Sequence, residues 1–200
     1  MVQSYIYSII QNYEKDLQKV KQDGNALQWV KEQTPELCLA AVKQYGYALR
    51  YVKEQTLELC LEAVKEDGYA LKWVKEQTAE LCLAAVKEDG CALQYVKKQT
   101  PEICWAAVKE TGIALHWVKE QTSEFCWEAV QQSDGRFLQY VKDQTPELCW
   151  AAVKQHGCNL NFVKQQTPEI CWAAVKHKEW ALQYVRDSVL REQIKIHFNL

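Results

Sequence analysis

The segment GYALKWVKEQTAELCLAAVKED, from Gly68 to Asp89, decides the fold, because most of the chain repeats it with small changes. The period is 22 residues, with a single slip to 23, and each copy starts at a glycine: Gly24, Gly46, Gly68, Gly90, Gly112, Gly135 and Gly157. Self-similarity at a fixed period of this length is typical of an array of stacked repeats. Positions within a repeat are counted below from its glycine as position 1.

Apolar residues in each half of the repeat follow helical spacing. In the first half they fall at positions 3, 4, 6 and 7, and in the second half at positions 14, 15, 18 and 19. Both sets line one side of a helix and neither alternates as a strand would. The spacing predicts a first helix of about 8 or 9 residues and a second of about 10, which together form a hairpin.

The boundary between the two halves reads Gln-Thr-Pro-Glu in four repeats, as at Thr34-Pro35-Glu36. Threonine accepts the free N–H groups of a first helical turn, proline suits the first helical position, and glutamate complements the positive end of the helix dipole. The second helix is therefore predicted to begin after the threonine. The glycine of the next repeat is expected to end it in a left-handed conformation.

Hairpins this short cannot bury their apolar faces alone, so successive copies are expected to stack around a shared core. The sequence predicts an all-α solenoid of about eight two-helix repeats in one continuous domain. Residues 1–23 are interpreted as an N-terminal cap with a helix around Tyr5 to Ile10 and a polar second helix from Asn12 to Gln22. Residues 24–186 form the tandem repeats, and residues 187–200 a capping helix that starts near Ser188.

One extra residue enters the array at Gln131–Asp134, just before Gly135. We interpret it as an accommodated surface insertion with a local change of twist, because loops accept insertions at low thermodynamic cost.

Composition places the chain among folded, non-membrane proteins. Hydrophobic residues make up 48% and charged residues 25%, with a net charge of −2, and no apolar run approaches a membrane span. The N-terminal stretch has no basic region and no small-residue cleavage site, so no export signal is expected.

Seven of the nine cysteines occupy position 15, on the predicted buried face. Stacked helices lie about 8 to 10 Å apart, too far for a disulfide or a shared zinc ion. The sequence therefore predicts reduced, buried thiols in a cytoplasmic compartment and no metal site. Cys91 and Cys158 at position 2 stay open as exceptions.

Lysine forms two rows, which are candidate binding residues. At position 8 the row comprises Lys31, Lys53, Lys75, Lys97, Lys119, Lys142 and Lys164, and a second row lies at position 20. Such rows suit a phosphate backbone, but glutamate recurs at position 13 and offsets them. The sequence favours solvated helix faces over nucleic-acid binding.

A glutamine recurs at position 10, where we expect it to satisfy backbone groups in the tight turn between the two helices. The aromatic row at position 6 is most simply core. At position 16, leucine in the early repeats gives way to a candidate binding row of four tryptophans, Trp105, Trp127, Trp150 and Trp172.

Two interpretations of the tryptophan row stay open. The row could form an aromatic groove for a partner. Alternatively, large and small residues exchange between positions 2 and 16, as in a packed pair of conserved volume. We favour burial, which predicts that Cys91 lies near Trp105, Ile113 near Trp127, and Cys158 near Trp172.

Catalytic patterns are missing from the sequence. It has no glycine-rich phosphate loop, no nucleophile elbow and no paired metal-binding histidines, and the four histidines share no repeat position. We expect no enzymatic activity and no cofactor.

The unit G-[YC]-A-L-x-[YW]-V-K-x-Q-T-P-E-[LI]-C-[LW]-x-A-V-K, as in Gly90 to Lys109, resembles a short helical repeat known only as a domain of unknown function. The resemblance covers residues 24–186. That repeat occurs in tandem in large DNA viruses of amoebae and in amoeba-associated microbes, which implies a viral protein with a scaffolding or host-interaction role. We therefore expect a protein-protein interaction scaffold, with nucleic-acid binding through the lysine rows at positions 8 and 20 as the alternative.

Overall fold

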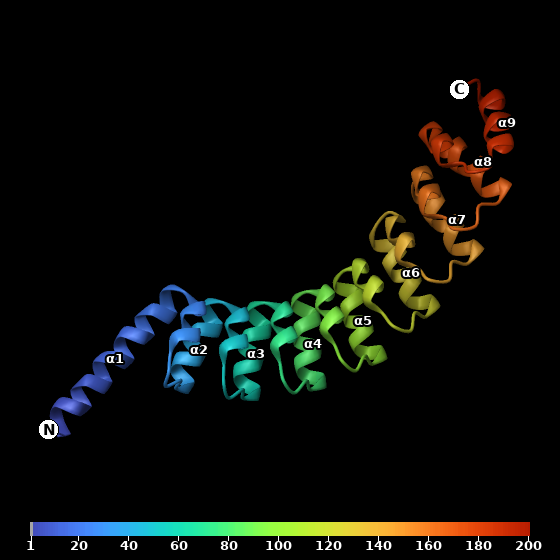
Figure 1. The fold of residues 1–200 in the computed structure, drawn as a ribbon. Coiled ribbons are helices and arrows are strands. Elements are labelled where there is room, and N and C mark those ends of the chain that lie inside the picture. Colours follow the sequence, from blue (N-terminus) through green and yellow to red (C-terminus); the bar gives the residue numbers. More distant parts are fainter. Residues whose placement is uncertain (1) are drawn as a thin grey trace. The chain divides into compact units, whose positions relative to one another are not determined.

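The computed structural model describes residues 2–200, which fall into two compact units, one up to Glu110 (unit 1) and one from Thr111 onward (unit 2). Each unit alternates 3₁₀ helices (η) with α-helices, and no strand occurs among the described residues (Figure 1). Unit 1 contains α1 (Val2–Gln22), η1 (Gly24–Trp29), α2 (Pro35–Gln44), η2 (Gly46–Tyr51), α3 (Leu57–Glu66), η3 (Gly68–Trp73), α4 (Ala79–Glu88), η4 (Gly90–Tyr95) and α5 (Pro101–Glu110). Unit 2 contains η5 (Gly112–Trp117), α6 (Ser123–Gln132), η6 (Arg136–Tyr140), α7 (Pro146–Gln155), η7 (Gly157–Phe162), α8 (Pro168–His177), η8 (Glu179–Tyr184) and α9 (Ser188–Phe198).

Within each unit the repeats stack on their neighbours, which confirms the predicted repetitive helical architecture. Each α-helix contacts the next α-helix, and each 3₁₀ helix contacts the next 3₁₀ helix. The core lies between these two layers. It is built from positions 3, 4 and 7 of the first half and from positions 14, 15, 18 and 19 of the second, as in Leu71, Val74 and Val86.

The second half of each repeat forms the predicted α-helix with the predicted start. In α2, Thr34 Oγ1 accepts a hydrogen bond of 3.3 Å from the Leu37 N–H, and Pro35 is the first helical residue. The same threonine cap recurs at the start of α3, α4, α6, α7 and α8. A threonine side chain thus satisfies one of the free N–H groups at each of these helix starts.

The first half of each repeat differs from the prediction, because it is a 3₁₀ helix of five or six residues and not an α-helix of 8 or 9. The recurring glutamine of position 10 gives the physical reason. Gln77 Nε2 donates to the Leu71 carbonyl at 3.4 Å, within its own repeat. The carbonyl of Trp73, the last residue of η3, accepts from Gln55 Nε2 at 2.9 Å. In a longer α-helix these carbonyls would accept backbone N–H groups of the following turn. Here they accept hydrogen bonds from glutamine side chains instead.

The glutamines form a ladder between repeats, which we call the glutamine ladder: Gln33, Gln55 and Gln77 in unit 1, and Gln121, Gln144 and Gln166 in unit 2. Each donates from Nε2 to the position-6 carbonyl of the next repeat at 2.9 Å. Each also accepts, at Oε1, the position-8 N–H of the next repeat at 2.9 to 3.0 Å. The predicted backbone-satisfying role is confirmed, and it extends across the repeat boundary.

The predicted left-handed glycine cap is wrong at most repeats, since Gly135 is the one described glycine with positive φ, at 84°. Space explains the other glycines. A Cβ on Gly68 would lie 2.5 Å from the Ala85 carbonyl oxygen, and one on Gly46 would lie 2.6 Å from the Ala63 carbonyl oxygen. Glycine is required at these two positions because the first residue of η2 and of η3 sits against the backbone of the following α-helix.

The predicted break between two N-terminal helices is also wrong, because α1 runs continuously over Val2–Gln22. Its C-terminal part takes the place of a second helix, since α1 contacts both η1 and α2 and buries Val20. At the other end, Ser188, which the sequence suggests as the N-cap of the last helix, is instead the first residue of α9. The cap is Asp187, whose Oδ1 accepts the Leu190 N–H at 3.0 Å.

The extra residue in unit 2 is absorbed in the turn between α6 and η6. Asp134 and Gly135 both adopt positive φ, at 51° and 84°, and Ser133 is buried. Asn159, which stands where most repeats have alanine, donates from Nδ2 to the Asp134 carbonyl at 2.6 Å and to the Ala152 carbonyl at 2.8 Å. A polar side chain in the next repeat thus satisfies the backbone displaced by the insertion.

Candidate functional site

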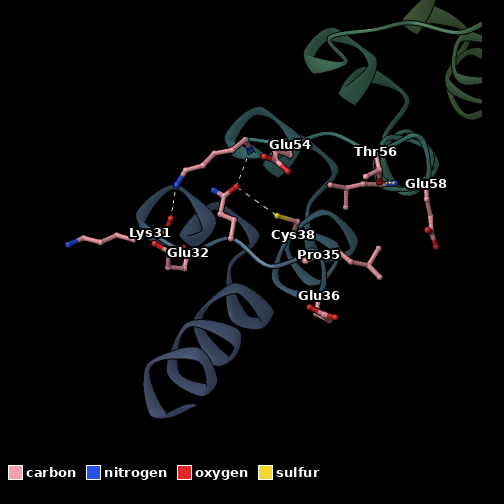
Figure 2. A pocket seen from close by; sticks show the side chains of 12 residues that line it. Lys31, Glu32, Pro35, Glu36, Cys38, Glu54, Thr56 and Glu58 are labelled. Carbon is pink, nitrogen blue, oxygen red and sulfur yellow. Dashed lines mark hydrogen bonds between the residues drawn. The ribbon is translucent and has the colours of Figure 1, made fainter. Parts of the chain in front are cut away.

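The main candidate site is a groove in unit 1 between the N-terminal ends of α2 and α3, with a volume of about 440 Å³ (Figure 2). The linkers that precede the two helices form its sides, so residues of two consecutive repeats line it. We call it the leucine groove. Its lining residues are Lys31, Glu32, Gln33, Pro35, Glu36, Cys38, Leu39, Lys53, Glu54, Thr56, Glu58 and Leu59.

Apolar side chains of α2 and α3 form the floor of the leucine groove. Leu59 is 7% exposed and Cys38 is buried, whereas Leu39 at position 16 is half-buried. Gln33 orders the polar part of the site, because its Oε1 accepts the Lys53 N–H at 3.0 Å and the Cys38 Sγ–H at 3.8 Å (Figure 2). The floor is therefore held in place by the glutamine ladder.

The rim of the leucine groove is acidic. Four carboxylates line it, Glu32, Glu36, Glu54 and Glu58, against two lysines. One of those lysines is engaged internally, since Lys53 Nζ donates to the Lys31 carbonyl at 2.6 Å. Figure 2 shows the side chains of Glu36 and Glu58 directed away from the helices that carry them. An apolar floor beneath a net negative rim favours a ligand with both apolar and cationic groups.

Unit 2 contains a smaller groove at the equivalent place, between the N-terminal ends of α6 and α7, with a volume of about 190 Å³. We call it the tryptophan groove. It is lined by Gln121, Thr122, Ser123, Cys126, Trp127, Asp143, Thr145 and Leu148. Trp127 occupies the position that Leu39 holds in the leucine groove.

The four tryptophans of position 16 are not fully buried, so the predicted burial is met only in part. Trp127 is 38% exposed, while Trp105, Trp150 and Trp172 are half-buried. Trp172 packs against α9, with ring centroids 4.9 Å from His197 and 5.7 Å from Phe198. Within the row, Trp172 thus contacts the following helix, and Trp127 borders a groove.

The pairing of positions 2 and 16 stays a prediction for Cys91, Ile113 and Cys158. A position-2 contact that the structure does show runs to the next repeat. Tyr69 hydrogen-bonds Cys91 and lies edge-on to Tyr95, with ring centroids 5.8 Å apart.

The predicted core placement of the position-6 aromatics is wrong. Trp29 is 79% exposed and Trp117 38%, and the remaining members of the row are half-buried. Position 6 is the last residue of each 3₁₀ helix, where the neighbouring leucine of position 4 and valine of position 7 already fill the core.

The lysine row of position 8 has a structural role that sequence reasoning missed. The ammonium groups of Lys53, Lys75 and Lys97 donate to the position-8 carbonyl one repeat back at 2.6 to 3.0 Å, as do those of Lys142 and Lys164. Arg186 makes the same contact with the Lys164 carbonyl at 2.8 Å. Lys31 and Lys119 provide carbonyls to this series.

The lysines of position 20 lie on the exposed side of the α-helices. Lys43 and Lys65 both pair with Glu62, at 3.6 and 3.5 Å, and all three side chains are at least partly exposed. Lys109 and Lys154 lie over the rings of Trp105 and Trp150, at 5.2 and 5.8 Å from the ring centroids. Four lysines of the second row therefore have partners on the α-helices, and the Lys43–Glu62 pair joins consecutive repeats.

All nine cysteines are free thiols, and the seven of position 15 are buried. Burial raises the pKa of the Cys38, Cys60 and Cys82 thiols, with a smaller opposing effect of the nearby lysine of position 8. Thiols of this kind stay protonated at neutral pH and are poor nucleophiles. Among residues 2–200, no cluster of histidine, cysteine or carboxylate side chains is arranged to hold a metal ion.

Two glutamates of position 13, Glu124 and Glu169, contact the starts of their helices. The pKa of Glu124 is lowered by a hydrogen bond from its own backbone N–H and by one from the Thr122 hydroxyl. Glu169 has a lowered pKa for the same reason, with Thr167 as the second donor. These carboxylates stabilise the first helical turn and stay ionised at neutral pH.

Within the described part of the chain, none of the helices combines the length and apolar character that a membrane crossing requires. A family model described as a domain of unknown function, DUF4116, matches residues 34–77. That stretch runs from the threonine cap of α2 to Gln77, which is two full periods, and it contains nine of the twelve residues that line the leucine groove. No curated protein and no solved structure matches the chain.

Proposed function

We propose that this repeat protein is a non-enzymatic scaffold that binds other proteins. The observation that carries the proposal is the leucine groove, which joins an apolar floor to a charged rim on the surface of two stacked repeats. Surfaces built in this way bind side chains of a partner, because the floor provides apolar burial and the rim provides orientation.

The regular placement of the polar residues supports a non-enzymatic role. The glutamine, lysine and glutamate of positions 10, 8 and 13 recur from repeat to repeat and bond to the backbone in several copies. Because these polar residues have the same structural role in successive repeats, they do not form a single cluster that differs from the rest and could act in catalysis. The nine free thiols support a reducing compartment such as the cytoplasm.

The resemblance to tandem repeats of large DNA viruses of amoebae and of amoeba-associated microbes extends the proposal to a host-directed partner. The match with a domain of unknown function is consistent with a helical repeat protein and adds no activity of its own.

A selection with a displayed random-peptide library against the purified chain tests the scaffold proposal. Enriched peptides that bind saturably and compete with one another are the expected result. The same chain is titrated with single-stranded and duplex nucleic acid at two salt concentrations, because phosphate contacts weaken steeply as salt rises. Salt-sensitive nucleic-acid binding together with no enriched peptide would overturn the proposal in favour of the lysine rows.

A further inference from the structure

We propose that the leucine groove between α2 and α3 takes an apolar side chain of a partner segment that carries lysine or arginine beside it. Leu39, the residue at position 16, leaves this groove open. This inference rests on the scaffold function proposed above and names the chemistry of the partner at one site.

The two grooves provide an internal comparison of the residue at position 16. Leu39 lines the groove of about 440 Å³, and Trp127 lines the equivalent groove of about 190 Å³. An indole is much larger than the leucine side chain, and the groove that it lines is the smaller of the two. Tryptophan in unit 2 therefore occupies the place that a partner side chain is inferred to occupy in unit 1.

The floor of the leucine groove selects an apolar group. Leu39, Leu59, Cys38 and Pro35 contribute carbon and sulfur atoms to the lining, and the Cys38 thiol is uncharged because burial raises its pKa. Covering these atoms releases water from apolar surface, which stabilises the complex in proportion to the area covered. A wholly polar ligand would gain nothing from this floor.

The rim selects a cationic neighbour for that apolar group. Glu32, Glu36, Glu54 and Glu58 surround the floor, and Lys53 already donates its ammonium group to the Lys31 carbonyl. A phosphate backbone would be repelled by four carboxylates, whereas a lysine or arginine would be attracted. The aliphatic stem of such a side chain can also lie along the apolar floor while its charge reaches the rim.

Binding of matched fluorescent peptides to the full chain tests the inference. One short peptide has a central phenylalanine flanked by lysines, and a second has the same phenylalanine flanked by glutamates. We expect the lysine-flanked peptide to bind and the glutamate-flanked peptide to bind at least about tenfold more weakly, as opposed charge patterns discriminate partners. Equal affinity of the two peptides would contradict the inferred role of the rim.

The substitution Leu39→Trp tests the floor, because it places in the leucine groove the residue that four other repeats carry at the same position. The variant is expected to keep its helical circular dichroism and to bind the lysine-flanked peptide more than about tenfold more weakly, the effect of losing a buried anchor. Leu83→Trp is the matched control, since it makes the same change in α4, outside the lining of the groove. Undiminished binding by Leu39→Trp would overturn the inference.

A charge variant keeps the inference testable if Leu39→Trp fails to fold. The double variant Glu36→Gln and Glu58→Gln is expected to weaken the lysine-flanked peptide by about threefold to tenfold, with less sensitivity to salt than the wild type. Glu169→Gln removes a carboxylate of the same repeat position in α8 and is expected to leave binding unchanged. Equal binding by the double variant and by Glu169→Gln would contradict the inferred site.

The outcomes separate this inference from the scaffold proposal. Peptides enriched by selection that bind equally to Leu39→Trp and to the wild type would leave a scaffold whose binding surface lies elsewhere. The absence of both enriched peptides and lysine-flanked peptide binding would overturn both proposals.

Discussion

Removing one side chain of the glutamine ladder should weaken the stack locally. Gln55 Nε2 lies 2.9 Å from the Trp73 carbonyl, and Gln55 Oε1 lies 3.0 Å from the Lys75 N–H, so the substitution Gln55→Ala removes two hydrogen bonds between consecutive repeats. With a net contribution of about 0.5 to 1.5 kcal/mol for each bond, we expect a loss of about 1 to 3 kcal/mol. Two further contacts of Gln55 lie within its own repeat: Nε2 donates to the Leu49 carbonyl at 3.4 Å, and Oε1 accepts from Cys60 Sγ at 3.7 Å.

Native-state hydrogen exchange measures this loss where it occurs, because repeat arrays open locally and need not unfold as a single cooperative unit. The Lys75 amide should exchange faster in Gln55→Ala than in the wild type. Gln28→Ala is the control, since Gln28 is exposed and its Nε2 donates only to the Asn25 carbonyl of the same repeat. Equal effects of the two substitutions on unfolding in urea would refute the ladder as a source of stability.

A second variant at the same site tests the geometry of the ladder. Gln55→Glu keeps an acceptor for the Lys75 N–H, but it places a carboxylate oxygen against the Trp73 carbonyl. The pKa of that carboxyl is expected to rise in the folded state, so the deficit in stability should shrink as pH falls through the raised value. A deficit that stays constant with pH would mean that the amide donor is not used.

The other predictions concern glycine, cysteine and tyrosine. Gly68→Ala should destabilise the chain by about 1 to 3 kcal/mol in urea unfolding, against the helix preference for alanine, because the added Cβ would lie 2.5 Å from the Ala85 carbonyl oxygen; an unchanged midpoint would contradict the close approach. Cys82→Asp should destabilise far more than Glu88→Lys in the same assay, since Cys82 is 4% exposed whereas Glu88 is exposed, and a buried charge lacks compensation. Burial, with contributions from Cys91 and Asp89, raises the pKa of Tyr69 from its ordinary 10 to about 12, so its share of stability should be present below pH 10 and lost as pH rises toward 12. The variant Tyr69→Phe should flatten that alkaline decline, and an unaltered decline would exclude Tyr69 as its source.

The repeat and its second helix could be predicted from the sequence because their signals are local. The threonine cap, the proline of the first turn and the apolar spacing of positions 14, 15, 18 and 19 all lie within one segment. The role of the position-10 glutamine was also accessible, since a buried amide must find partners.

The 3₁₀ form of the first helix could not be predicted from spacing alone. Over a segment of only six residues, apolar residues at positions 3, 4 and 7 lie on one face of an α-helix and also on one face of a 3₁₀ helix. What decides between them is a hydrogen bond from the preceding repeat, as between Gln55 and Trp73, which no local pattern contains. The exposure of Trp29 follows from the same cause, because the shortened helix ends at that residue.

The leucine groove was hidden for a related reason. The exchange of leucine for tryptophan at position 16 is visible in the sequence, where it indicates packing against position 2 of the same repeat. The groove forms between consecutive repeats, so its floor comes from residues such as Leu39 and Leu59 that lie twenty positions apart.

The insertion before Gly135 shows which part of the repeat tolerates a change in length. Its extra residue widens the sequence separation between Gln121 and Tyr140 from 18 to 19, yet the Gln121 Nε2 to Tyr140 carbonyl distance stays at 2.9 Å. The turn from an α-helix to the next 3₁₀ helix therefore accepts added chain. The linker between each 3₁₀ helix and the α-helix of the same repeat has no such freedom. Its lysine of position 8, its glutamine of position 10 and its capping threonine each hydrogen-bond to one particular residue. Tags, loops or fused domains placed inside this array therefore belong in the turn from an α-helix to the next 3₁₀ helix, where the contact between neighbouring repeats is kept.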